Sequence, residues 1–186
     1  MKILTLFGIT GRLQTQVDQM RPKLYRLAYS WCHNSALADD LVQETLIKAL
    51  KNESQLRDPA LMKSWLFSIL ANCLRDHFRK SREMDDIDEL EDFLYASETT
   101  PEDELSQAQI ILRVRSAVAK LPVGQRQVLT LVDLEELSYI EVAEVLGVPI
   151  GTVMSRLCRA RIAMKSLLRE LEPIKTIQIN KLRSVK

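Results

Sequence analysis

The chain has 186 residues, of which 46% are hydrophobic and 27% charged, and its formal net charge is +1. This composition is typical of a globular protein of one domain or two small ones, and no stretch approaches the roughly 20 apolar residues of a membrane-spanning helix. With only 5 Gly and 6 Pro, abundant Leu, Ala, Glu and Arg, and no alternating Val, Ile and Thr runs, the sequence predicts an all-α fold.

The small net charge conceals a strong separation of charge along the chain. Residues 83–107 hold 11 acidic side chains and no basic one, so the remainder has 26 Lys and Arg against 14 Asp and Glu. That remainder therefore carries a net charge of roughly +12. Basic lobes on either side of an acidic connector favour a polyanionic partner over a membrane surface or an acidic small molecule.

The first zone, residues 17–82, has the periodicity of packed helices. One helix is expected to begin with Asn34 or Ser35 as its N-cap and to run through LADDLVQETLIKAL. On a helical wheel its buried side comprises Ala38, Leu41, Val42, Thr45, Leu46 and Ala49. Its exposed side comprises Asp40, Gln43, Glu44, Ile47 and Lys51. An isoleucine among acidic residues suggests a protein-binding surface, and a solvated face with one apolar residue is an equally compatible interpretation.

The segment SWLFSILANCLRDHFRK predicts a second amphipathic helix in this zone. Its inward side comprises Trp65, Leu66, Ile69, Leu70 and Cys73. A polar stripe on the opposite face comprises Ser68, Asn72, Arg75 and Arg79, continued by Lys80 and Arg82. Asn and Arg at this spacing suit a nucleic-acid backbone, and a solvent-facing basic stripe is the alternative. The preceding residues 52–62, which include Pro59, form a loop long enough to hold an unstacked base.

Residues 83–104, EMDDIDELEDFLYASETTPEDE, predict an acidic flexible linker, because a run of like charge adjoins a cluster of Ser, Thr and Pro. Residues 173–186, PIKTIQINKLRSVK, predict a basic and poorly ordered tail.

The third zone, residues 105–172, predicts a second helical domain. Its first helix, over 105–120, ends before Pro122, which disfavours the α conformation at the residue before it. Another helix is expected over about 124–133.

The segment LSYIEVAEVLGVPIGTVMSRL predicts a helix-turn-helix. Ser138 and Glu141 form a capping-box pattern, so a short helix starts directly after the serine. Gly147 supplies the left-handed residue that ends it, and the next helix begins near Pro149 or Gly151.

The second helix of this motif separates an apolar face from a polar one. The inward residues are Val153, Leu157, Ala160, Met164 and Leu167. Thr152, Ser155 and Arg159 point the opposite way, with Arg156 on the flank. Small hydroxyls and arginine suit phosphates and base edges in a major groove, and a solvated face is the alternative. Ile162 also points outward, which groove binding does not explain, so a protein partner is expected there.

Signals of enzymatic or metal chemistry are weak. Cys32, Cys73 and Cys158 are widely separated and lack a CxxC pair, as expected for reduced thiols in a cytosolic protein. Neither His33 nor His77 lies near other metal-ligand side chains, and no glycine-rich phosphate loop or Ser/His/Asp pattern is present. We therefore expect no metal, no cofactor and no catalytic residue.

Together, LADDLVQETLIKAL, SWLFSILANCLRDHFRK and the long segment LPVGQRQVLTLVDLEELSYIEVAEVLGVPIGTVMSRLCRARIAMKSLL resemble the group IV, or extracytoplasmic-function, sigma factors of bacterial RNA polymerase. The resemblance implies two small helical domains: a region-2-like domain over 17–82, and a region-4-like helix-turn-helix domain over 105–172. Glu136 stands where the family often has glycine, so the turn before LSY is expected to be shaped differently.

The resemblance also assigns roles to residues. It implies that the clamp helices of core polymerase are bound by Asp40, Gln43, Glu44 and Ile47. Binding of the melting minus-10 strand falls to Asn72, Arg75 and Arg79, with the loop 52–62 capturing a flipped base. Contacts with minus-35 DNA fall to Arg126, Thr152, Ser155, Arg156 and Arg159.

The function implied is that of a cytoplasmic promoter-specificity subunit, which binds the clamp helices and the flap of core RNA polymerase and directs initiation at promoter DNA. An anti-sigma factor is a further expected partner. The alternative is a stand-alone helix-turn-helix regulator, against which the polar stripe and the outward acidic face both argue, and an α-helical hydrolase lacks any convergent site.

Overall fold

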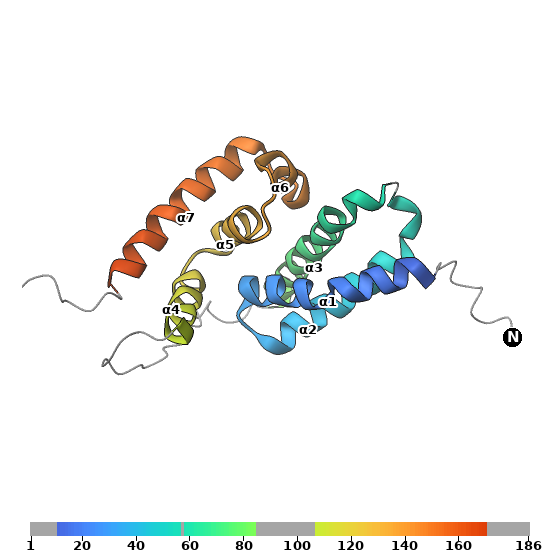
Figure 1. Ribbon diagram of the computed structural model, residues 1–186, viewed down its shortest axis with the longest axis horizontal. Coiled ribbons are helices and arrows are strands. Elements are labelled where there is room, and N and C mark those ends of the chain that lie inside the picture. The colour runs from blue at the N-terminus through green and yellow to red at the C-terminus, as the bar shows by residue number, and fades with distance from the viewer. Residues whose placement is uncertain (1–10, 57, 85–106, 171–186) are drawn as a thin grey trace, which may run out of the picture.

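The computed structural model of the chain describes residues 11–56, 58–84 and 107–170. Within these ranges every regular element is a helix and none is a strand, so the predicted all-α fold is confirmed. The helices form two lobes, coloured blue to green and yellow to red in Figure 1. The predicted basic tail lies outside the described residues, and so does the predicted linker apart from its first two residues.

Three long helices build the N-terminal lobe: α1 (Gly11–Cys32), α2 (Ser35–Lys51) and α3 (Met62–Met84). Asn34 is the N-cap of α2, and its side-chain oxygen accepts the backbone N–H of Leu37 at 3.0 Å. This bond satisfies one of the free donors in the first turn of the helix. All six positions predicted for the inner side of α2 are buried, so the wheel assignment is confirmed.

The loop predicted between α2 and α3 contains two short 3-10 turns, Glu53–Gln55 and Pro59–Leu61. Asp58 caps the second turn, because its carboxylate accepts the backbone N–H of Ala60 at 2.9 Å. Part of this connection is therefore ordered by its own hydrogen bonds.

The C-terminal lobe contains α4 (Gln107–Ala119), α5 (Val123–Leu129), a π-helical turn η3 (Thr130–Leu134), α6 (Tyr139–Leu146) and α7 (Ile150–Glu170). The predicted capping box is present, since Ser138 and Glu141 each bond the other's backbone N–H. Gly147 has φ 63° and ends α6 in the left-handed conformation. The predicted helix-turn-helix is confirmed.

The helix predicted over 124–133 changes its hydrogen bonding at Thr130. The Thr130 hydroxyl donates to the carbonyl of Arg126 at 2.8 Å, and the Glu135 N–H reaches back five residues to the Thr130 carbonyl at 3.0 Å. A threonine that bonds to the preceding turn competes with the regular ladder, so the α-helix gives way to a π-helical turn.

Glu136 retains the backbone geometry of a glycine. Its φ of 58° lies in the left-handed region, and it follows Glu135, the C-cap of the π-helical turn. The turn before α6 therefore has the conformation that glycine adopts most readily, even though the residue is glutamate.

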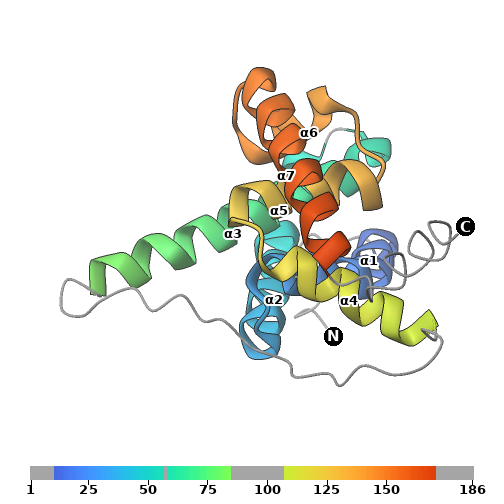
Figure 2. The ribbon, with the colours of Figure 1, turned by 90° about the vertical axis from the view of Figure 1, so that its left-hand side faces the viewer.

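The two lobes pack against each other rather than standing apart. Helix α1 contacts α4 and α5, while α3 contacts α6, and Figure 2 shows the C-terminal lobe lying over the N-terminal one. Buried apolar residues of both lobes form one continuous hydrophobic cluster. The arrangement is a closed one in which a single core holds both halves of the chain.

Replacing Glu136 by glycine should stabilise the protein. A non-glycine residue at positive φ costs about 1–2 kcal/mol, of which the greater flexibility of unfolded glycine cancels a part. We expect Glu136→Gly to raise the free energy of unfolding by about 0.5–1 kcal/mol in urea titrations, whereas Glu136→Ala should not. Equal stability of the two variants would show that the φ of this residue is not strained.

Candidate nucleic-acid interface

The polar face predicted for α7, which comprises Thr152, Ser155 and Arg159 and is called the reading face below, is open to solvent. Ser155 and Arg159 are exposed and Thr152 is partly exposed, whereas Val153, Leu157 and Ala160 are buried, as the wheel predicted. The Thr152 N–H bonds the Pro149 carbonyl at 2.8 Å, which closes the first turn directly after the motif's tight turn. The hydroxyls thus lie at the N-terminal end of α7, the end that a recognition helix directs to base edges.

Arg159 extends along the outer surface of α7 toward that end. Its Nε donates to the Ser155 carbonyl at 3.2 Å, and one terminal nitrogen lies 3.4 Å from the Ser155 hydroxyl. These contacts hold the guanidinium beside the Ser155 hydroxyl. A guanidinium so placed can pair with both acceptors of a guanine in a major groove.

Arg156 occupies the flank of α7, as predicted, and lies across α5. A Cβ added to Gly124 would come within 3.1 Å of the Arg156 guanidinium carbon, so the side chain occupies space that only glycine leaves open. The guanidinium is therefore positioned beside the first turn of α5.

The polar stripe of α3 is only partly free. Asn72, Arg75 and Arg79 all lie on the outer side of the helix, as predicted. Arg75 donates to the Asn72 side chain at 2.9 Å and to the backbone carbonyl of Leu146, in the other lobe, at 2.7 Å. Arg79 forms an ion pair with Asp76 at 3.3 Å. The structure thus brings Arg75 to the lobe boundary and leaves the other two outside it.

Arg126 lies half-buried at the lobe boundary, close enough to His33 for its positive charge to help lower the pKa of that histidine. Burial lowers the pKa of its guanidinium, and its Nε has no hydrogen-bond partner among the described residues. The contact with minus-35 DNA that the family resemblance implies for Arg126 stays a prediction, and in this arrangement the side chain is half-buried.

The outer face of α2 carries the predicted docking residues. Asp40 and Gln43 are exposed, and Ile47 has 52% of its surface exposed. Glu44 pairs with Lys48 at 2.8 Å within the same helix. This face combines acidic groups with one large apolar side chain that is open to solvent.

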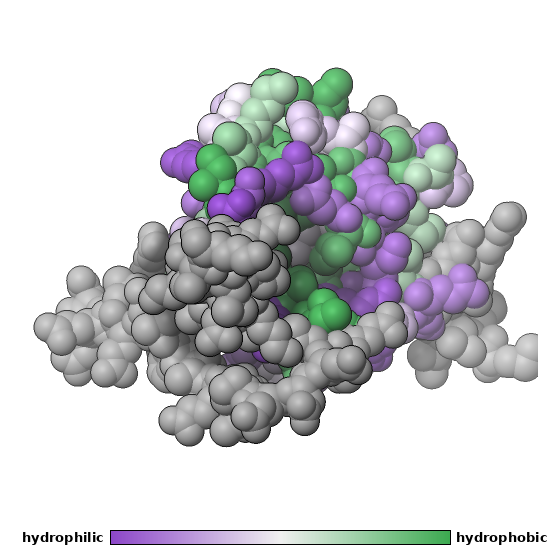
Figure 3. All heavy atoms as spheres, turned by 60° about the vertical axis from the view of Figure 1, so that its left-hand side comes forward, coloured by the Kyte–Doolittle hydropathy of each residue, from purple (hydrophilic) through white to green (hydrophobic). Residues whose placement is uncertain are grey.

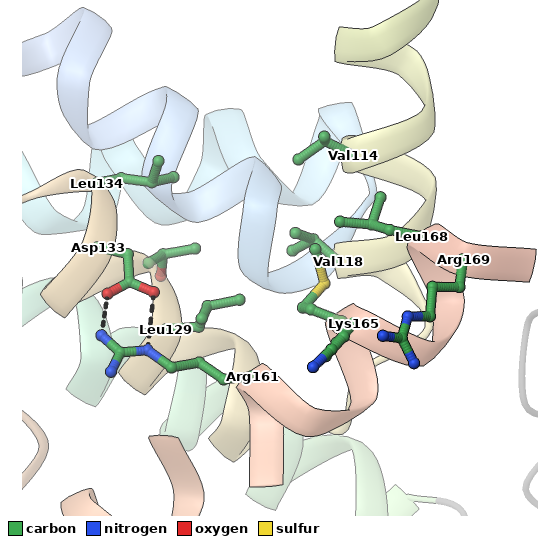
Figure 4. A pocket seen from close by; sticks show the side chains of 11 residues that line it. Val114, Val118, Leu129, Asp133, Leu134, Arg161, Lys165, Leu168 and Arg169 are labelled. Carbon is green, nitrogen blue, oxygen red and sulfur yellow. Dashed lines mark hydrogen bonds and ion pairs between the residues drawn. The ribbon is translucent and has the colours of Figure 1, made fainter. Parts of the chain in front are cut away.

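An apolar groove between α4 and α7, of about 600 Å³, was not predicted (Figure 4). Val114, Leu129 and Leu168 contribute to its apolar lining, and Lys165 and Arg169 line it from α7. Asp133 and Arg161, paired at 2.6 Å, lie at its edge. The sequence held one signal for it: the run QIILRV places apolar residues all around α4, more than one core face requires.

Further apolar side chains are exposed around the helix-turn-helix: Ile140, Ile150, Met154 and Ile162, the last with 65% of its surface open. Figure 3 shows hydrophobic residues exposed among hydrophilic ones on one face of the molecule. The predicted outward position of Ile162 is confirmed.

The described residues hold neither a metal-binding cluster nor a membrane-spanning helix. None of these residues form a cluster of three or more His, Cys, Asp or Glu side chains that could hold a metal ion. The cysteines at 32, 73 and 158 are free thiols, and no described helix is long and apolar enough to cross a membrane.

Two protein families match separate parts of the chain. Residues 16–83 match Sigma-70 region 2, and residues 111–164 match Sigma-70, region 4. These ranges coincide with the two lobes and include the α3 stripe and the helix-turn-helix.

Whole proteins are similar as well. The chain is 35% identical to the ECF RNA polymerase sigma factor EcfG of Rhodopseudomonas palustris over 161 residues, 86% of this chain and 87% of the relative. It is 31% identical to the ECF RNA polymerase sigma factor SigW of Bacillus subtilis, covering 83% and 88%. A solved structure of the sigma factor RpoE with the anti-sigma factor NepR from Bartonella quintana matches with a TM-score of 0.70 and 28% identity, covering 86% and 98%.

The free energy of unfolding should depend on pH through His33. Burial, assisted by the charge of Arg126, lowers the pKa of His33 to about 4 from 6.5. Between these values the unfolded chain binds a proton that the folded chain does not, so the free energy of unfolding falls as the pH is lowered.

Between pH 7 and pH 4, we expect the free energy of unfolding to fall by about 1–3 kcal/mol more in wild type than in His33→Asn. Asparagine tolerates the φ of 51° at this position, so the comparison isolates the titration. Urea denaturation at a series of pH values measures the difference, and parallel curves for the two proteins would contradict it.

Proposed function

The chain belongs to the sigma-70 family, in the extracytoplasmic-function group of RNA polymerase sigma factors, and we propose how its two lobes divide the recognition of a promoter. As a sigma factor it binds core RNA polymerase and directs transcription initiation at specific promoters. The observation that carries the proposal is that one chain presents two separate polar reading faces, the α3 stripe and the N-terminal half of α7.

The minus-35 element is assigned to the C-terminal lobe. Thr152, Ser155 and Arg159 enter the major groove from the exposed end of α7, and Arg156 contacts the flanking backbone. Arg126 adds a phosphate contact once its side chain is exposed. At this end of a recognition helix, hydroxyl and guanidinium groups can contact both phosphates, which position the helix, and base edges, which specify the sequence.

The minus-10 element is assigned to the N-terminal lobe. Asn72, Arg75 and Arg79 lie along α3 and bind the melting strand, while residues 52–62 capture a flipped base. Few aromatic side chains are available for stacking, since the whole chain has 5% aromatic residues. Strand opening therefore relies on base capture and on polar contacts with the backbone.

Two surfaces are assigned to proteins. The outer face of α2, with Asp40, Gln43, Glu44 and Ile47, docks on the clamp helices of the polymerase. The α4–α7 groove accepts an apolar helix, either from the polymerase flap or from an anti-sigma factor. The solved structure of a similar sigma factor, RpoE, contains the anti-sigma factor NepR, which supports such a partner for this chain.

The chain itself is proposed to perform no catalysis, to need no cofactor, and to act in the cytoplasm beside the polymerase. A stand-alone helix-turn-helix regulator needs neither the α3 stripe nor the acidic α2 face, so this alternative explains less of the surface.

Run-off transcription from a genomic DNA library, with purified core polymerase in the presence and absence of the chain, tests the proposal. New start sites that share sequence elements at minus-10 and minus-35 are expected. Unchanged start sites, together with tight duplex binding by the chain alone, would support the regulator instead.

Arg159→Ala should weaken minus-35 recognition. Loss of a base-edge contact costs about 1–3 kcal/mol and relaxes the preference at one position of the element. Selection of start sites from a randomised minus-35 library, read by sequencing, measures this preference. Arg26→Ala, which removes an exposed arginine of α1, is the control. A preference that survives in Arg159→Ala would remove this residue from the reading face.

Asp40→Lys combined with Glu44→Lys should abolish co-elution with core polymerase. Reversing two charges on the proposed docking face replaces attraction by repulsion, whereas the fold should survive because both side chains lie on the outer face of α2. The control, Asp18→Lys with Glu144→Lys, makes the same change of net charge at exposed sites elsewhere. Retained co-elution of a folded double variant would show that the docking face lies elsewhere.

A further inference from the structure

Three ion pairs in the N-terminal lobe form a continuous series from α2 to α3. The Glu44 carboxylate pairs with the Lys48 ammonium at 2.8 Å, and the same ammonium lies 3.7 Å from the Asp76 carboxylate in α3. Asp76 in turn pairs with Arg79 at 3.3 Å. The series therefore begins at a residue assigned to polymerase docking and ends at a residue assigned to minus-10 DNA.

Lys48 is shared between the two helices. Its side chain is 38% exposed and that of Asp76 is 39% exposed, so both lie partly buried where α2 packs against α3. The hydrogen bond with Glu44 raises the pKa of the Lys48 ammonium, which therefore stays charged near neutral pH. Because the ammonium lies closer to Glu44 than to Asp76, Glu44 is the stronger of these two partners.

Asp76 divides its carboxylate between two cations. One oxygen, Oδ2, faces Lys48, and the other, Oδ1, faces Arg79. A cation that moves closer to Oδ2 neutralises more of the shared charge and so weakens the attraction between Oδ1 and Arg79. The strength of the Arg79 pair therefore depends on how closely Lys48 approaches Asp76.

Asp76 is also a negative charge beside a surface proposed to bind a polyanion. It lies about one helical turn from both Asn72 and Arg79, so a DNA strand along the α3 stripe would pass close to it. A carboxylate without a close cation repels phosphates there, and a carboxylate paired with Arg79 withholds that guanidinium. Closer pairing of Asp76 with Lys48 removes both obstacles.

We propose that Lys48 and Asp76 are positioning residues that form a relay between the polymerase-docking face and the minus-10 stripe. When a basic group of the polymerase pairs with Glu44, the Lys48 ammonium moves to Asp76, and Asp76 releases Arg79 to a phosphate. Such coupling is reciprocal, so strand binding at Arg79 strengthens docking at Glu44 by the same factor. This inference rests on the proposed function for its two ligands and on the described ion pairs for the relay itself.

Nuclear magnetic resonance of the free chain tests the relay without polymerase or DNA. The probe is the nitrogen–proton signal of Arg79 Nε, assigned by its loss in Arg79→Lys. Glu44→Gln stands in for the polymerase, because it removes the charge that holds Lys48. It should shift the Arg79 signal part of the way toward its position in Asp76→Asn.

Two controls establish the path of the relay. Asp39→Asn removes another exposed carboxylate of α2, more than two helical turns before Lys48, and should leave the Arg79 signal unchanged. In Lys48→Met, where the connection is cut, adding Glu44→Gln should have no further effect. An Arg79 signal that does not respond to Glu44→Gln, or that responds equally without Lys48, would overturn the relay.

Run-off transcription with core polymerase tests the coupling at a start site used by wild type. Lys48→Met leaves Asp76 without its lysine and should lower the yield per bound chain about two- to fivefold, the range expected for partly exposed ion pairs. Adding Asp76→Asn should restore the yield, because the repelling carboxylate is gone, whereas adding Asp76→Glu should not. A double variant with Asp76→Asn that is no better than Lys48→Met would show that the lysine does not act through Asp76.

The two tests separate this inference from the proposed function. Circular dichroism establishes that each variant is folded, and co-elution with core polymerase measures the bound chain. If wild type produces no new start sites, the proposed function fails, while the Arg79 signal still decides the relay. If start sites appear but the Arg79 signal does not respond to Glu44→Gln, the relay fails and the proposed function stands.

Discussion

The buried indole N–H of Trp31 requires a hydrogen-bond acceptor. The Thr130 hydroxyl, 99 residues along the chain, supplies it. The course of the chain from the end of α5 to the start of α6 depends on this bond. Because Thr130 accepts from Trp31 and donates to Arg126, it fixes the end of α5 against α1 and starts the π-helical turn. That turn delivers Glu135 to the two lysines of the N-terminal lobe, and the left-handed Glu136 then redirects the chain into α6.

From α6 onward the structure is set by local signals. The capping box starts the helix, Gly147 ends it, and α7 begins three residues later. These short-range devices determine the direction of α7 and therefore which side chains face a groove. Long-range packing decides only where the finished motif lies relative to the other lobe, so the reading face and its accessibility are controlled by different parts of the molecule.

The structural features that could be predicted from the sequence are those that depend on interactions between residues a few positions apart. The six inner positions of α2 and the helix-turn-helix follow from periodicity and capping, and both are confirmed. The N-cap of α2, predicted at Asn34 or Ser35, is Asn34. Contacts between residues 71 or 72 positions apart, such as Arg75 with Leu146 and Lys63 with Glu135, have no local signature. The π-helical turn escaped prediction because a lone threonine looks like an ordinary helical residue. The α4–α7 groove was missed because apolar residues all around a helix do not say which of them stay uncovered.

The π-helical turn has a consequence for how this chain can change in length. The stretch from Thr130 to Glu136 looks like a connector, and connectors between helices normally accept insertions and deletions. Here, loss of one residue would restore a regular helix and rotate all later residues of the lobe by about 100°. The Glu135 carboxylate would then turn away from both lysines, and the left-handed position would fall on a different residue. We therefore expect descendants of this sequence to vary freely in the identity of the exposed residues of this stretch while keeping its number of residues constant.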